Sequence, residues 1–65
     1  MKEFHIEVWQ DNVLISGALS AGASPVEAFE HSVQGGMIPR PDGEVQVVAT
    51  SSDTGFRYPF EVDCG

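Results

Sequence analysis

Cysteine is almost absent from this 65-residue chain: Cys64 stands alone, so no disulfide can form within it. The two histidines, His5 and His31, have no cysteine near them in the sequence. Because zinc sites need three or four ligands, we expect no metal ion, and nothing in the sequence calls for another cofactor. A chain that does not depend on disulfides suits a reducing compartment, so the sequence predicts a cytoplasmic protein.

Long apolar runs and basic residues are also scarce. No segment approaches the ~20 apolar residues of a membrane span, so we expect no membrane association. Three basic residues stand against ten acidic ones, which gives a net charge of −7. A protein of this charge repels nucleic-acid phosphates and is attracted to positively charged surfaces, although acidity can also serve solubility alone.

Catalytic patterns are missing as well. The serines have no evident base and orienting acid, and Gly35–Gly36 predicts the end of a helix rather than a phosphate-binding loop. Glu27 and His31 have a spacing that suits a metal, but no third ligand is nearby. So short a chain can hardly enclose a substrate pocket of ordinary size. We therefore expect a protein that is not an enzyme.

Apolar residues that alternate with polar ones predict a hairpin at the start of the chain. In EFHIEVW, the residues Phe4, Ile6 and Val8 point to one side. Asp11–Asn12 is a favoured pair for a two-residue turn. Such a turn pairs Val8 with Ile15 and Phe4 with Leu19, so both apolar sets would face the core.

A second hairpin is predicted near the end of the chain. A four-residue loop over residues 51–54 would pair Ala49 with Phe56 and Val45 with Phe60. In this register Glu44 opposes Glu61. Pro59 has no N–H to donate, so its strand is expected either at an edge of the sheet or bulged at this residue.

The stretch ASPVEAFEHSVQGG between the hairpins predicts a helix over residues 24–34. Ser24 is a good N-cap, Pro25 suits the first helical position, and Glu27 completes a capping box. Gly35–Gly36 then ends the helix. A helix this short must be held by packing on a sheet.

The order strand, strand, helix, strand, strand predicts one compact domain over residues 1–65. Its fold class is α+β: a small two-layer domain in which an antiparallel β-sheet (ββαββ) has one helix packed on one face. The expected core contains Phe4, Ile6, Val8, Ile15, Leu19, Val26, Phe29, Val33, Val45, Val47, Phe56, Tyr58, Phe60 and Val62.

The side of the sheet turned away from the helix is the expected partner-binding surface. Trp9 should lie opposite Leu14 outside the core, and tryptophan is enriched at binding hot spots. Carboxylates surround this pair. The predicted partner-binding residues are Glu3, Glu7, Trp9, Leu14, Glu44 and Glu61; a plain solvated surface is the alternative.

The strands over residues 4–8 and 15–21, the helix start over residues 24–29, the small size and the acidity together resemble the plan of small anti-CRISPR proteins. The resemblance implies a phage protein that acts in the host cytoplasm as a DNA mimic. Such an inhibitor binds a protein partner at its basic, nucleic-acid-binding surface, makes no direct contact with nucleic acid, and is a monomer or a weak homodimer. The alternatives are an antitoxin-like or regulatory module with a cognate protein partner, and a small enzyme subunit active only in a complex.

Overall fold

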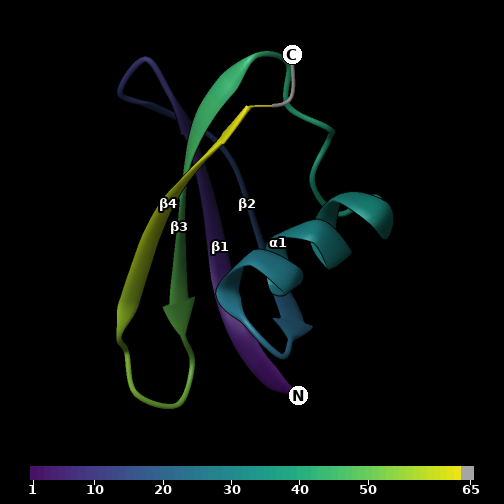
Figure 1. Cartoon of the computed structure of the whole chain (residues 1–65), viewed down its shortest axis with the longest axis vertical. Helices are drawn as coiled ribbons and strands as arrows, with labels where there is room; N and C mark the ends of the chain where they lie inside the picture. Colours follow the sequence, from purple (N-terminus) through teal and green to yellow (C-terminus); the bar gives the residue numbers. More distant parts are fainter. Residues whose placement is uncertain (64–65) are drawn as a thin grey trace.

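The computed structural model describes residues 1–63 as four strands and one helix (Figure 1). The elements are β1 (Lys2–Gln10), β2 (Val13–Gly22), α1 (Pro25–Gln34), β3 (Glu44–Ser51) and β4 (Arg57–Asp63). This order and the packing of α1 on one face of the sheet confirm the predicted α+β fold. Cys64, the single cysteine, lies outside the described residues.

All neighbouring strands are antiparallel, and their order across the sheet is β2-β1-β3-β4. The two hairpins therefore lie side by side, with β1 and β3 in the centre. Their connections are at opposite ends of the sheet, the β1–β2 turn at the top of Figure 1 and the β3–β4 loop at the bottom. Pro59 lies on β4, an edge strand, as predicted.

The first hairpin begins as predicted and then departs from the predicted register. Asp11 and Asn12 form the turn with φ values of 52° and 63°, and Trp9 pairs with Leu14. One extra residue, Ile15, then enters β2 as a bulge, so Val8 pairs with Ser16 instead. A shift of one residue moves every following side chain to the other face. The prediction that Ile15 and Leu19 face the core is therefore wrong: they are 46% and 58% exposed.

The second hairpin is shifted by two residues from the predicted register. Val45 pairs with Val62 and Val47 with Phe60. An even shift keeps each side chain on its expected face, so Phe60 and Val62 still pack against the core. The shift moves Phe56 out of the strand, however, and Phe56 and Tyr58 are both exposed rather than buried.

Helix α1 begins at the predicted N-cap, Ser24, but Glu27 reaches back to Ala23 rather than to the N–H of Ser24 that a capping box uses. The backbone N–H of Glu27 donates to Ser24 Oγ at 3.2 Å, and the N–H of Ala23 donates to Glu27 Oε1 at 3.3 Å. The face turned to the sheet carries Ala28, Phe29 and Ser32. Val26 is exposed, which corrects its predicted place in the core.

The core lies between α1 and the strands and consists of Phe4, Ile6, Val8, Ala28, Phe29, Ile38, Val45, Val47 and Ala49. Ile38, in the connection after α1, was missed at the sequence level. The helix packs mainly on β2 and comes close to it: a Cβ built on Gly22 would lie 2.6 Å from the backbone N of Ala28. The helix found within residues 1–63 is too short to cross a membrane.

Candidate binding surface

The sheet has one face packed against α1, while its other face is not covered by any element of residues 1–63 (Figure 1). We call this uncovered surface the outer face. Alternation along the paired strands assigns to it Glu3, His5, Glu7 and Trp9 of β1, Leu14, Gly17 and Leu19 of β2, Glu44, Gln46, Val48 and Thr50 of β3, and Arg57, Pro59, Glu61 and Asp63 of β4. The six residues predicted to bind a partner all lie on the outer face.

Negative charge dominates the outer face. Its five carboxylates, Glu3, Glu7, Glu44, Glu61 and Asp63, lie on β1, β3 and β4. Arg57 is the one arginine or lysine at the outer-face positions of these strands. Its Nη2 lies 3.8 Å from Glu7 Oε1, and the arginine side chain is 66% exposed. An exposed ion pair at this distance contributes little to stability, so Arg57 neutralises only part of the negative patch.

Like charges oppose each other at one end of the outer face. Glu44 pairs with Asp63 across β3 and β4, and Glu61 pairs with Gln46. The predicted opposition of Glu44 and Glu61 is therefore wrong, but Glu44 still faces a carboxylate. Glu44 and Asp63 therefore bring two acidic side chains together at this end of the outer face.

Trp9 lies between Leu14 and Gln46 on the outer face and is partly buried. Its indole Nε1 is buried and finds no hydrogen-bond acceptor within residues 1–63. Beside the ring is an open hollow of about 250 Å³, which Asp11, Asn12 and Glu44 also line. A partner that touches Trp9 would meet ring carbons rather than the N–H.

A second surface, which sequence reasoning missed, lies where α1 stops short of β4. An open groove of about 330 Å³ runs between Phe29 and Val33 on the helix and Val62 on β4, with Arg40 at its margin. At the start of β4, the ring of Tyr58 lies 4.7 Å from that of Phe56, which precedes the strand, and both rings are exposed. The signal was present in the sequence: a helix of ten residues, about 10–12 Å wide, cannot cover four strands spaced ~4.8 Å apart.

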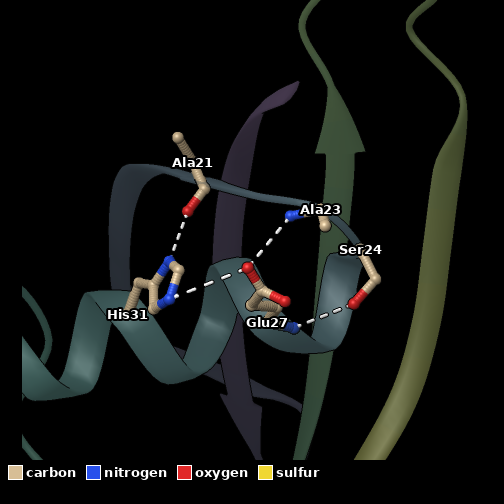
Figure 2. A network of polar contacts seen from close by, with 5 residues as sticks. All are labelled: Ala21, Ala23, Ser24, Glu27 and His31. Atoms are coloured by element: carbon tan, nitrogen blue, oxygen red, sulfur yellow. Dashed lines mark hydrogen bonds and ion pairs between the residues drawn. The ribbon is translucent and has the colours of Figure 1, made fainter. Parts of the chain in front are cut away.

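Glu27 and His31 take part in a network of polar contacts between α1 and the end of β2 (Figure 2). Figure 2 shows both side chains on α1, turned toward the segment that leaves β2. His31 Nδ1 is 2.8 Å from the carbonyl oxygen of Ala21, and His31 Nε2 is 3.8 Å from Glu27 Oε1. The same Glu27 oxygen accepts the N–H of Ala23. The network ties α1 to the end of β2.

No group of three or more potential metal ligands occurs within residues 1–63. No protein-family model, curated protein or solved structure matches the chain.

Proposed function

We propose that this protein is a binding protein that inhibits a nucleic-acid-binding complex by covering its basic surface with the outer face, in the manner of an anti-CRISPR protein. The observation that supports the proposal is the charge of the outer face, where five carboxylates stand against Arg57. Lysine and arginine side chains that normally hold phosphates would meet these carboxylates instead.

The spacing of the carboxylates suits this role. Glu3 and Glu7 lie ~14 Å apart along β1, and the three acidic strands together span ~10 Å across the sheet. These lengths are close to the Debye length of ~10 Å at 0.1 M salt. An approaching basic protein therefore experiences the carboxylates as one negative patch, which speeds encounter more than it sets final affinity.

Glu44 and Asp63 concentrate negative charge at one end of the outer face. A lysine or arginine of the partner placed beside them would add to the electrostatic attraction. Trp9 and Leu14, next to this end, would supply the apolar contact that slows dissociation.

The first experiment isolates the partner and then tests how the charge of the outer face affects binding. A pull-down from a lysate of the cell in which the protein acts identifies the bound protein, and binding kinetics are measured at low and high salt. The test variant is Glu44→Lys with Glu61→Lys. The control is Glu30→Lys with Asp53→Lys, which changes the net charge equally at exposed positions away from the outer face. We expect the test variant to associate ~10-fold or more slowly and the control to behave nearly as the parent. An equal effect of both variants would contradict a role for the outer face.

A regulatory or antitoxin-like module that docks through apolar contacts is the second candidate, and the exposed rings of Phe56 and Tyr58 favour it. Salt separates the two candidates, because apolar docking does not weaken as charges are screened. Trp9→Ala should raise the dissociation rate and cost ~2 kcal/mol or more if the outer face binds. If Phe56→Ala weakens binding, Trp9→Ala does not, and salt has no effect, the second candidate is the correct one.

A further inference from the structure

The two edges of the sheet are protected very differently. At one edge, β4 carries Pro59 and the charged residues Arg57, Glu61 and Asp63, all of which oppose the addition of another strand. At the other edge, β2 has ten residues and carries no charged side chain. It is the one strand of the described sheet without a charge. A long uncharged edge strand presents unpaired N–H and C=O groups to a further strand.

The direction of the free backbone groups of β2 follows from the ladder on the other side of β1. The N–H of Ser52 donates to the carbonyl oxygen of Glu3 at 3.0 Å, so Glu3 directs its backbone groups toward β3. Glu3 pairs with Ala21 of β2 but therefore forms no backbone hydrogen bond with it. In such a pair both residues direct their N–H and C=O groups away from each other, so those of Ala21 point to the open edge. Antiparallel pairs alternate along a strand, so Leu19 and Gly17 also direct N–H and C=O outward.

Part of this edge is already occupied. The carbonyl oxygen of Ala21 lies 2.8 Å from His31 Nδ1, so the helix closes the end of β2 (Figure 2). Between Leu14 and Leu19 no strand of the described sheet pairs with the open side of β2. The three large apolar side chains along this stretch are exposed, with Leu14 at 49%, Ile15 at 46% and Leu19 at 58%.

We propose that a second copy of this chain binds at this edge, with β2 of each copy paired antiparallel about a two-fold axis. If the axis passes beside Ala18, Leu19 of each copy pairs with Gly17 of the other. Each of these pairs can exchange both backbone hydrogen bonds, because both residues direct their groups outward. Gly17 has no side chain, so it leaves room for the facing Leu19, and the two Leu19 side chains approach each other diagonally.

If two copies of this chain associate, charge favours contact through β2 over contact through the other surfaces. Two copies with a net charge of −7 repel each other on most approaches. Pairing through β2 brings no charged strand of one copy directly against a charged strand of the other. A two-fold axis also makes the same surface serve both partners, as in most homodimers.

The dimer is expected to be weak. The free stretch from Leu14 to Leu19 is ~17 Å long, and the shortest extent of the molecule is 15 Å. The pairing therefore covers ~250 Å² on each copy, far below the ~800 Å² per partner of a stable interface. The axis is perpendicular to the sheet, so the dimer places both outer faces on the same side and doubles the acidic surface that one copy presents.

The test combines sedimentation with amide hydrogen exchange on the full chain, from ~10 μM to ~1 mM, a range suited to a weak dimer. We expect a concentration-dependent dimer that strengthens as NaCl rises from ~0.05 to ~0.5 M, because salt screens the repulsion between the copies. The amides of Gly17 and Leu19 should gain protection as the dimer forms, while that of Ala18, already bonded to β1, should change little. A chain that remains monomeric at every concentration and salt would overturn the proposal.

Two variants of Leu19 test the pairing itself. Leu19→Lys sets two lysines close together across the axis. Leu19→Pro removes an N–H that has no partner within the described sheet. Both should reduce dimerisation at least tenfold. Ile15→Lys should also weaken the dimer, whereas Val26→Lys, equally exposed at 46% but on α1, should leave it unchanged. Circular dichroism identifies any variant that fails to fold. A dimer that survives both Leu19 variants, or that Val26→Lys abolishes, would contradict pairing through β2. Because salt strengthens this dimer and weakens the proposed binding to a basic partner, either proposal can fail without the other.

Discussion

Gly22→Ala tests how closely α1 approaches the sheet. Gly22 lies at the end of β2, and a Cβ placed there would be 2.6 Å from the N of Ala28 and 3.0 Å from its Cα. Both atoms belong to the helix backbone, which cannot turn aside as a flexible side chain can. The added methyl must therefore push α1 away from β2, which would loosen the packing of Ala28 and Phe29 and stretch the bond between His31 and Ala21.

The size of the effect can be estimated from overpacking in other proteins. An extra methyl in a well-packed core costs ~1–3 kcal/mol. A domain of this length has a total stability of ~3–10 kcal/mol. The loss should lower the melting temperature by about 5–20 °C.

Gly17→Ala is the matched control, since Gly17 lies on the same strand. Its built Cβ meets nothing closer than the carbonyl oxygen of Ile6 at 3.4 Å, an ordinary contact. Alanine is also favoured over glycine within a strand by ~0.5–1 kcal/mol, so this variant should melt at or above the parent temperature. Thermal and urea unfolding followed by circular dichroism measure both variants. If Gly22→Ala is as stable as Gly17→Ala, the close approach of α1 to β2 is wrong.

Ile38→Ala should destabilise the domain by ~2–5 kcal/mol, because Ile38 is buried in the core, whereas Ile15→Ala should cost less than ~1 kcal/mol because Ile15 is exposed. If urea unfolding showed that both variants lose the same free energy of unfolding, Ile15 would be buried and the register of the first hairpin would have no bulge. Ser24→Ala removes the oxygen that accepts the N–H of Glu27 and should cost ~1 kcal/mol. Measured at a temperature where the variant stays folded, its affinity for the partner should be unchanged, and a large loss would place Ser24 in the interface.

The local features of this protein could be predicted from its sequence because each depends on a few neighbouring residues. Ser24 is the N-cap of α1 as expected, and Asp11–Asn12 make the turn, since these residue types tolerate positive φ. The alternation in β1 and β3 was equally clear, because both are central strands with one face on the core. The placement of Glu3, Glu7 and Trp9 on the outer face followed from this alternation, and that of Leu14 from its pairing with Trp9 next to the turn.

Which side chains of β2 face the helix was decided by the tertiary structure. This strand carries two alternating sets, the apolar pair Ile15 and Leu19 and the small residues Ser16, Ala18, Ser20 and Gly22. Hydrophobicity favours burying the apolar pair, and the sequence-based register did so. In the folded chain the small residues face α1, because only a surface without large side chains lets the helix backbone come within contact of the strand. The bulge at Ile15 makes this possible and turns Leu19 outward.

The extent of helix coverage was also a property of the whole fold. The sequence by itself determined that one helix packs on a four-stranded sheet, because caps, turns and alternation are local signals. Where the helix lies over the sheet was decided only by the tertiary structure, in which α1 packs mainly on β2 and leaves Phe56 and Tyr58 exposed beside β4. The physical reason is that the position of a helix depends on the shape of the surface beneath it. That surface is assembled from strands far apart in the sequence, and a residue's neighbours along the chain do not encode it.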